Sequence, residues 1–331
     1  MPQMTVLEIL NRTKVFFEKK GVPDARLDAE YIICFGLGIK KRMDLYLNFD
    51  KPLSAAELDK LRPLVARRAN REPLQHIVGD TSFRGHTIKC DTRALVPRPE
   101  TEELVDMAKD RLKEVANPFI VEVGTGTGAI AIACAKEIPG ARVLATDISN
   151  DALALARENA EANGLGNNAA TTSSTAAGDS NAPGEKTAGS LQFAQGDLLD
   201  AVTSDFIAKV VGASAGSAGS PTLSATLPKI DCLIANLPYI PDSEKGKLQP
   251  EVDKFDPELA LYGGPDGLTL VRKMLQQTEG RMSAGASILL EIGSEQAATL
   301  EAEAGNYPWL EFTGIHKDFC GNIRFVSYKT K

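Results

Sequence analysis

A buried strand, a glycine turn and a helix follow one another directly in this 331-residue chain, and this order constrains the fold most strongly. The apolar run Phe119–Val123 leads into Gly124-Thr125-Gly126-Thr127-Gly128, and small apolar residues at helical spacing continue to Lys136. Glycines let the backbone turn sharply and approach a ligand that a Cβ would push away. The order therefore predicts an α/β sheet that binds a nucleotide-like ligand at this turn.

The glycine pattern alone leaves the ligand open. Gly124, Gly126 and Ala129 also satisfy the G-x-G-x-x-G/A dinucleotide fingerprint, so an NAD-dependent dehydrogenase must be considered. Asp147 ends the next predicted strand, Arg142–Thr146. A carboxylate at that place binds ribose hydroxyls of either NAD or S-adenosylmethionine, so it does not separate the two readings.

A second motif, Asn236-Leu237-Pro238-Tyr239, directly follows the apolar run Ile230–Ala235. A planar amide or aromatic amine is a poor nucleophile because its nitrogen lone pair is delocalised. The side-chain carbonyl of Asn236 and the backbone carbonyl of Pro238 could accept its two N–H hydrogens and favour a pyramidal nitrogen. Tyr239 would lie against the flat face of the target group. A plain strand-end turn is the alternative, since Asn and Pro are common in turns.

The two motifs together favour methyl transfer over hydride transfer. Glu122 precedes the glycine turn, and a later strand of the same domain ends in the amide-holding tetrapeptide, for which a dehydrogenase has no use. We expect direct in-line displacement, with Asn236 and Pro238 holding the nitrogen in a near-attack position. No side chain near the motif has an obvious general-base role, so the proton would leave to water after transfer.

Four motifs occur in one order and carry a family resemblance. They are Leu95-Val96-Pro97-Arg98-Pro99-Glu100-Thr101-Glu102, the glycine turn, the Asn-x-Pro-Tyr tetrapeptide and Pro257-Glu258-Leu259-Ala260-Leu261-Tyr262-Gly263-Gly264-Pro265-Asp266-Gly267-Leu268. The chain resembles the HemK/PrmC protein-(glutamine N5) methyltransferases, from the first helix to Asp318–Tyr328 apart from two inserted stretches. That family uses S-adenosylmethionine to methylate the glutamine of the Gly-Gly-Gln motif in peptide-chain release factors.

The resemblance implies roles for single residues. Gly124 to Gly128 would line the methionine and ribose part of the donor, and Asp147 would take its ribose hydroxyls. Asp197 and Leu198 would flank the adenine, while Asn236 would touch both donor and substrate. The Arg98–Thr101 loop would help to form the donor pocket.

One position departs from the family pattern, because the usual tetrapeptide has proline where this chain has Leu237. The proposed hydrogen bonds come from positions 236 and 238, so we expect the change to be tolerated. The ribosomal RNA adenine dimethyltransferases also carry Asn-Leu-Pro-Tyr, and adenine N6 poses the same planar-nitrogen problem. In those enzymes the glycine turn lies near the N-terminus and Asn usually follows the tetrapeptide, whereas Ile240-Pro241-Asp242 follow it here. RNA adenine methylation therefore ranks second, ahead of a donor-binding scaffold without activity.

The composition predicts a cytoplasmic enzyme without a metal. The five cysteines are odd in number and widely spaced, and the three histidines are too scattered for a metal cluster. Residues 1–10 lack a basic region followed by an apolar run, and no stretch approaches the ~20 apolar residues of a membrane span. We expect a monomer whose partner is a release factor and which binds neither a membrane nor DNA directly.

The net charge of −7 is unevenly spread. Residues 1–95 contain 17 Lys+Arg against 12 Asp+Glu, and the remainder contains 20 against 32. The basic residues concentrate at Lys60, Arg62, Arg67, Arg68 and Arg71, which indicates either a solvated helix face or a docking surface for an acidic protein. An acidic catalytic domain is poorly suited to bare nucleic acid, which favours a protein substrate.

The spacing of apolar residues divides the chain into three parts. Helical spacing over 6–20, 25–35, 41–47 and 55–70 predicts an N-terminal helical substrate-docking domain, residues 1–72, with a capping box at Ser54. Short alternating runs predict a β-hairpin linker over 73–97. Alternating strands and helices predict a methyltransferase domain over 98–331, and the resemblance implies the class I form, a doubly wound, mostly parallel seven-stranded sheet.

The end of the sheet and two insertions complete the predicted organisation. Trp309–His316 and Asn322–Lys329 are joined by so short a link that only antiparallel pairing is possible, which gives the sheet an antiparallel last strand. Residues 166–190 and 212–226 are rich in small and polar residues and read as low-complexity insertions. We expect a chain that lacks both insertions to retain methyl transfer.

Overall fold

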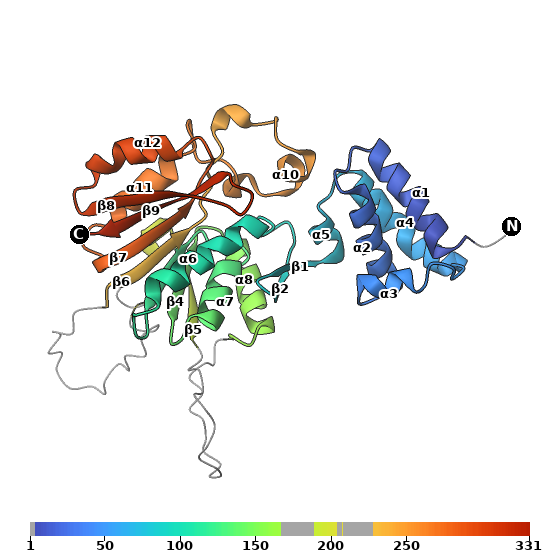
Figure 1. Cartoon of the computed structure of the whole chain (residues 1–331), viewed down its shortest axis with the longest axis horizontal. Helices are drawn as coiled ribbons and strands as arrows, with labels where there is room; N and C mark the ends of the chain where they lie inside the picture. Colours follow the sequence, from blue (N-terminus) through green and yellow to red (C-terminus); the bar gives the residue numbers. More distant parts are fainter. Residues whose placement is uncertain (1–3, 167–188, 204–206, 208–227) are drawn as a thin grey trace, which may run out of the picture. The chain divides into compact units, whose positions relative to one another are not determined.

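The computed structural model describes residues 4–166, 189–203, 207 and 228–331, and the chain forms two compact units (Figure 1). Unit 1 contains residues 1–81, 90–92 and 245–256, and unit 2 contains residues 82–89, 93–244 and 257–331. The third segment of unit 1, residues 245–256, thus follows shortly after the Asn-x-Pro-Tyr tetrapeptide. Most of the two predicted insertions lies outside the described residues.

Unit 1 is helical. Its helices are α1 (Val6–Lys19), α2 (Ala25–Leu37), α3 (Arg42–Tyr46), α4 (Ala55–Ala69), α5 (Leu74–Val78) and α10 (Pro250–Phe255). The predicted capping box is present: the Ser54 side chain accepts a hydrogen bond from the Glu57 amide, and the Glu57 carboxylate accepts one from the Ser54 amide. Leu10, Phe17 and Ile33 are among the apolar residues that form its core.

The basic cluster of α4 contains a buried ion-pair network. Arg68 is only 5% exposed and donates to Asp28 at 2.6 Å, and it also pairs with Glu251 of α10 at 2.9 Å. Arg71 makes two hydrogen bonds of 2.6 Å to the same Glu251 carboxylate. Because these arginines bind α10 within unit 1, the expectation that they belong to a solvated face or a docking surface is wrong for Arg68.

The predicted hairpin is shorter than expected and has a helical turn before it. Strands β1 (Asp80–Phe83) and β2 (His86–Lys89) form a two-stranded sheet, whereas the preceding Leu74–Val78 is α5. Pro73, with φ −51°, starts this turn, and Gly79, with φ 93°, ends it in the left-handed region. The proline at its start and the glycine at its end therefore favour a helical turn over the strand that the alternating pattern predicted.

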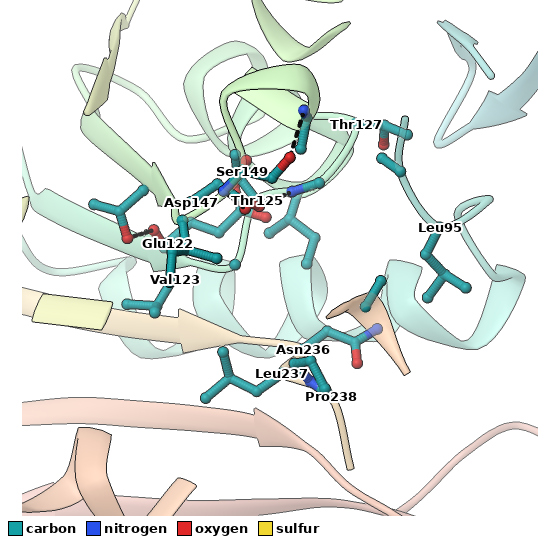
Figure 2. A pocket seen from close by; sticks show the side chains of 18 of the residues that line it. Leu95, Glu122, Val123, Thr125, Thr127, Asp147, Ser149, Asn236, Leu237 and Pro238 are labelled. Carbon is teal, nitrogen blue, oxygen red and sulfur yellow. Dashed lines mark hydrogen bonds between the residues drawn. The ribbon is translucent and has the colours of Figure 1, made fainter. Parts of the chain in front are cut away.

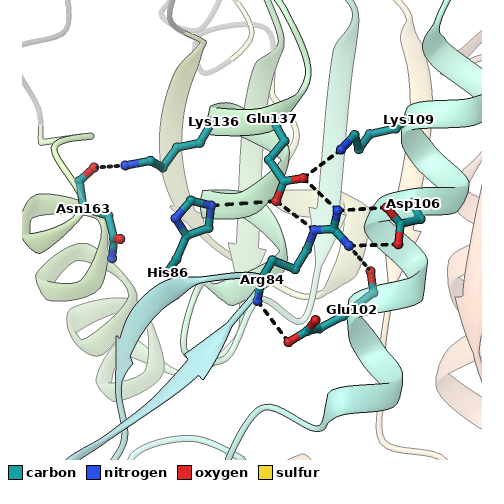
Figure 3. Close-up of polar contacts among 8 residues, drawn as sticks. All are labelled: Arg84, His86, Glu102, Asp106, Lys109, Lys136, Glu137 and Asn163. Atoms are coloured by element: carbon teal, nitrogen blue, oxygen red, sulfur yellow. Dashed lines mark hydrogen bonds and ion pairs between the residues drawn. The ribbon is translucent and has the colours of Figure 1, made fainter. Parts of the chain in front are cut away.

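The hairpin turn is fixed to unit 2 by a polar cluster around Arg84 (Figure 3). The Arg84 guanidinium binds Glu137 of α7 (Ala129–Glu137) with two bonds of 2.7 Å and Asp106 of α6 (Glu102–Leu112) with bonds of 2.9 and 2.8 Å. Burial alone would raise the pKa of Glu137, but hydrogen bonds from Arg84 and Lys109 outweigh it and lower this pKa to about 2. Glu137 is therefore a permanent carboxylate with a structural role.

Unit 2 is built on a seven-stranded sheet in the order β5-β4-β3-β6-β7-β9-β8. The strands are β3 (Phe119–Val123), β4 (Arg142–Asp147), β5 (Ser190–Gln195), β6 (Ile230–Ala235), β7 (Met282–Glu291), β8 (Leu310–Lys317) and β9 (Ile323–Thr330). Pairing is parallel from β5 to β7, and β9 is antiparallel to both β7 and β8. The predicted fold class is confirmed, including the antiparallel strand at its end.

Helices cover both faces of this sheet (Figure 1). They are α6 (Glu102–Leu112), α7 (Ala129–Glu137), α8 (Asn150–Ala162), α11 (Thr269–Gln277) and α12 (Ala297–Ala302). Ile120 packs in one core cluster with α6 and α7, whereas its neighbour Val121 packs in the other with α11 and α12. Successive residues of β3 thus point to opposite, equally buried faces. In the described part of the chain, no helix has both the length and the apolar character needed to cross a membrane.

Candidate active site

A cavity of about 190 Å³ lies in unit 2 at the carboxyl ends of β3, β4, β5 and β6 (Figure 2). Ligands of open parallel sheets bind at this edge. Most of the predicted site residues line the cavity, namely Glu122, Gly124, Thr125, Gly126, Thr127, Asp147, Asp197, Leu198, Asn236, Leu237 and Pro238. Gly128 and Tyr239 do not belong to its lining.

The glycine turn has the backbone geometry that the sequence predicts. Gly124, Gly126 and Gly128 have φ values of 75°, 54° and 82°, which residues with a Cβ rarely adopt. Gly128 has a packing role as well, because a Cβ there would lie 3.1 Å from the Cβ of Ala156 in α8. Asn159 of the same helix donates to the Thr127 carbonyl at 2.9 Å, which fixes the turn from behind.

Four amides of the turn donate hydrogen bonds to oxygens of the protein. Gly124 and Thr125 both donate to the Thr146 carbonyl, at 2.8 and 2.9 Å, and Gly128 donates to the Thr125 carbonyl at 2.8 Å. Gly126 donates to the Asp147 carboxylate at 2.9 Å. A pyrophosphate site needs such groups free, together with positive potential. The arrangement therefore disfavours the dinucleotide alternative.

Asp147 presents a carboxylate to the cavity from the end of β4. Its second oxygen accepts from the Ser149 amide at 2.9 Å. Burial raises its pKa, although the hydrogen bonds from the Ser149, Gly126 and Ile148 amides act in the opposite direction. These bonds leave further acceptor capacity on both oxygens, as binding a pair of hydroxyls requires.

Glu122 supports the turn from inside the protein. It is 1% exposed, and the Thr125 hydroxyl donates to its Oε2 at 2.6 Å. Burial raises its pKa to about 8, while the Thr125 hydrogen bond lowers it. Figure 2 shows Glu122 and Asp147 on the same side of the cavity, across from Asn236.

The residues after β5 close the cavity at another side. Leu198 is 7% exposed and has φ 55°, and its carbonyl accepts from the Thr146 hydroxyl at 3.4 Å. The Asp197 carboxylate pairs with Lys273 of α11. Both residues thus belong to the wall of the cavity.

Among the described residues, the Asn236 side chain bonds to Thr101, which the sequence analysis assigned only to the loop of the donor pocket. Its Nδ2 donates to Thr101 Oγ1 at 3.3 Å, and Thr101 Oγ1 in turn donates to Glu291 Oε2 at 2.7 Å. Burial raises the pKa of Glu291 to about 7, against the lowering effect of the Thr101 hydrogen bond. A lone glutamate that ends the apolar run 288–290 is the signal that could have identified Glu291.

The backbone of the tetrapeptide is packed against the glycines of the 257–268 motif. A Cβ on Gly263 would lie 2.2 Å from the Pro238 carbonyl oxygen, and one on Gly267 would lie 2.0 Å from that of Tyr239. Gln296 Nε2 donates to the Tyr239 carbonyl at 2.8 Å. Among the described residues none donates a hydrogen bond to the Pro238 carbonyl, and Pro238 lines the cavity.

Tyr239 and Leu237 are placed by packing. Burial raises the pKa of Tyr239, and Glu291 and Arg324 are among the charged groups that act on it. Leu237 is 4% exposed, and its Cδ2 would lie 3.1 Å from a Cβ on Gly124. The leucine thus connects the tetrapeptide to the glycine turn by an apolar contact.

Comparisons with known proteins agree with this geometry. Residues 8–79 match the PrmC N-terminal domain, and residues 120–208 match a methyltransferase domain. A release factor glutamine methyltransferase of Deinococcus radiodurans is 32% identical over 323 residues, which are 98% of this chain and 98% of that protein. The chain belongs to the release factor glutamine methyltransferases. The family resemblance predicted from the four motifs is confirmed.

The membership extends to distant organisms and covers both units. The protein of the same name from Rhodopirellula baltica is 32% identical over 330 residues, which are 98% of this chain and 95% of that protein. The human MTRF1L release factor glutamine methyltransferase is 28% identical over 335 residues, which are 97% of this chain and 86% of that protein. Such coverage leaves no part of the site outside the family match.

Proposed function

We propose that this protein transfers a methyl group from S-adenosylmethionine to the side-chain amide nitrogen, N5, of the glutamine in the Gly-Gly-Gln motif of peptide-chain release factors. The observation that carries the proposal is the orientation of Asn236. Its Nδ2 donates to Thr101, and no described residue donates to its side-chain oxygen, so this oxygen can accept a hydrogen bond from a ligand in the cavity that Pro238 also lines. The names of the full-length relatives support the same substrate.

The cavity suits the donor. The internally bonded glycine turn supplies a close-approaching backbone without an anion site, and Asp147 supplies acceptors for two ribose hydroxyls. We assign Gly124 to Thr127 to the methionine and ribose part, and Asp197 and Leu198 to the adenine. The bound donor supplies a methyl group on a positively charged sulfur, which is already activated for displacement.

The tetrapeptide prepares the acceptor. Two carbonyl oxygens, one from Asn236 and one from Pro238, would accept both N–H hydrogens of the glutamine amide. These two hydrogen bonds favour the pyramidal geometry that the nitrogen adopts as it attacks the methyl group, so they strengthen towards the transition state. We assign Tyr239 to the flat face of the amide and Leu237 to the apolar contact beneath it. The nitrogen loses its extra proton to water once the methyl group is attached.

A protein substrate is better supported than RNA. The relatives of similar length are named for release factors. Residues 96–331 carry 20 Lys+Arg against 32 Asp+Glu, which disfavours nucleic-acid phosphates. We assign residues 1–72 to docking of the release factor, and we place the reaction in the cytoplasm, where that substrate acts.

The test is a transfer assay with methyl-labelled S-adenosylmethionine and three substrates offered separately. They are a release factor, its variant with alanine in place of the Gly-Gly-Gln glutamine, and immature small-subunit ribosomal RNA. We expect label on the first substrate alone. Label on the RNA alone would favour adenine methylation, and label on the alanine variant at the same level would show that another residue is modified.

A further inference from the structure

Three side chains from distant parts of unit 2 form a hydrogen-bonded relay that ends at the cavity. Asn236 follows β6, Thr101 ends the short 3₁₀ turn Pro99–Thr101 before α6, and Glu291 ends β7. Thr101 is 5% exposed and Glu291 is 2% exposed, so water competes little for either bond. The glycine turn takes no part in this relay.

The chemistry of the three groups gives the relay a direction. An ionised carboxylate accepts hydrogen bonds only, so the single hydroxyl hydrogen of Thr101 is donated to Glu291 at 2.7 Å. Thr101 Oγ1 is then an acceptor towards Asn236, and it selects the NH₂ end of the amide, at 3.3 Å. The oxygen end of Asn236 is the one left for a ligand.

We propose that Thr101 and Glu291 are positioning residues that fix the side-chain orientation of Asn236, so that its carbonyl oxygen faces the amide to be methylated. The identity of the acceptor rests on the proposed function, whereas the relay itself rests on the hydrogen bonds alone. Neither residue is expected to touch the reacting atoms. Without the relay, the two ends of the Asn236 amide become nearly equivalent, and one of them repels an N–H donor.

The relay is sensitive to protonation of Glu291. Burial raises the pKa of Glu291 to about 7, and the negative charge of Glu100 acts in the same direction. The Thr101 hydrogen bond and the positive charges of Arg324 and Arg98 act in the opposite direction. Tyr239 also faces this carboxyl group. A protonated Glu291 can donate to Thr101, which frees the threonine hydrogen for Asn236 and reverses the preferred amide orientation. The turnover number should therefore fall as the pH drops through about 7.

Kinetics of the full chain test the proposal. Thr101→Val removes the hydroxyl at nearly constant volume, and we expect kcat to fall about 10-fold and its dependence on pH near 7 to be lost. Thr101→Ser restores the hydroxyl and should recover most of kcat and this pH dependence. Glu291→Gln should lower kcat and abolish the pH dependence as well. Thr278→Val, a buried threonine bonded to Leu275 and Trp309, is the matched control and should keep wild-type kcat and pH profile.

A second measurement needs no methyl transfer and separates this proposal from the proposed function. In ¹⁵N-labelled protein, the side-chain NH₂ signals of Asn236 should shift with a midpoint near pH 7, and the shift should vanish in Glu291→Gln and Thr101→Val. If the signals titrate but no release factor is methylated, the relay stands and the substrate assignment fails. Asn236 signals that do not titrate, or a Thr101→Val variant with wild-type kcat and pH profile, would overturn the relay.

Discussion

The two sides of the cavity differ in how their polar groups are held. On the donor side, amides of the glycine turn are bonded to the Thr146 carbonyl and the Asp147 carboxylate, which lie 21 or 22 residues later, at the end of the neighbouring strand β4. On the acceptor side, Asn236 depends on a side-chain relay through Thr101 to Glu291, residues that are 135 and 190 positions apart along its two links. The donor side is thus formed within one unit of two neighbouring parallel strands and the helix between them, whereas the acceptor side is complete only when three distant segments are packed together.

Two buried glutamates show the same contrast. Glu122 and Glu291 both lie at the carboxyl ends of parallel strands, and burial raises the pKa of both, to about 8 and about 7. Glu122 accepts from Thr125, three residues away in the turn that it supports. Glu291 accepts from Thr101, which holds the side chain proposed to bind the substrate. One carboxyl group therefore stabilises a loop, and the other orients a functional group.

The largest effect is expected from Asn236→Ala on the acceptor side. Loss of a hydrogen bond that is strongest in the transition state should lower kcat by a factor of ~10²–10³. Steady-state kinetics with a release factor measure it, and Asn306→Ala, at an exposed position of unit 2, is the control. Wild-type turnover in Asn236→Ala would show that the assigned role is wrong.

The next largest effect is expected from Gly263→Ala, which should disturb the backbone on the acceptor side and leave donor binding at the glycine turn unchanged. Gly263→Ala places a Cβ 2.2 Å from the Pro238 carbonyl oxygen, so that oxygen must move, and kcat should fall about 10- to 100-fold. Gly305→Ala is matched, because a Cβ there meets nothing within 4 Å, and it should behave as wild type. Calorimetric titration with S-adenosylhomocysteine should give similar affinities for both variants. A Gly263→Ala variant that lost donor binding and kept kcat would contradict the division into two sides.

A smaller effect, on donor affinity and not on kcat, is expected from Asp147→Asn on the donor side. The amide cannot reproduce both carboxylate acceptors, so donor affinity should fall about 10-fold while kcat at saturating donor changes little. The same calorimetric titration checks it, with Asp110→Asn on the exposed face of α6 as the control. An unchanged affinity would exclude Asp147 as a contact of the donor.

The smallest effect is expected from Leu237→Pro, which introduces the residue usual in the family. No described residue accepts a hydrogen bond from the Leu237 amide, and the proposed polar contacts come from positions 236 and 238, so kcat should stay within about 3-fold. Thermal denaturation should show lower stability, because the buried leucine packs against the glycine turn. Leu237→Ala is the comparison that removes packing alone. If Leu237→Pro lost most of its kcat while Leu237→Ala kept a normal kcat, catalysis in this protein would depend on the backbone at position 237 and not on the leucine side chain.

The difference between the two sides also explains what the sequence could predict. The strand, turn and helix at 119–137 are adjacent in the chain, so glycine and apolar patterns predicted them, and the antiparallel end of the sheet followed from a short connection. The relay could not be predicted, because Thr101 and Glu291 carry no spacing relation to Asn236. The helical turn Leu74–Val78 was not predicted, because the prediction followed a weak alternating pattern, whereas the conformations of Pro73 and Gly79 favour a helical turn. Burial of Arg68 depends on α10, whose Glu251 lies 183 residues later in the chain (251 − 68).

The most direct test of the account is a crystal structure of the protein with S-adenosylhomocysteine and a peptide containing Gly-Gly-Gln. We expect the glutamine amide nitrogen to lie within hydrogen-bonding distance of Asn236 Oδ1 and of the Pro238 carbonyl, with Asn236 Nδ2 still bonded to Thr101. A glutamine bound elsewhere, or an Asn236 that presents its NH₂ group to the substrate, would contradict it.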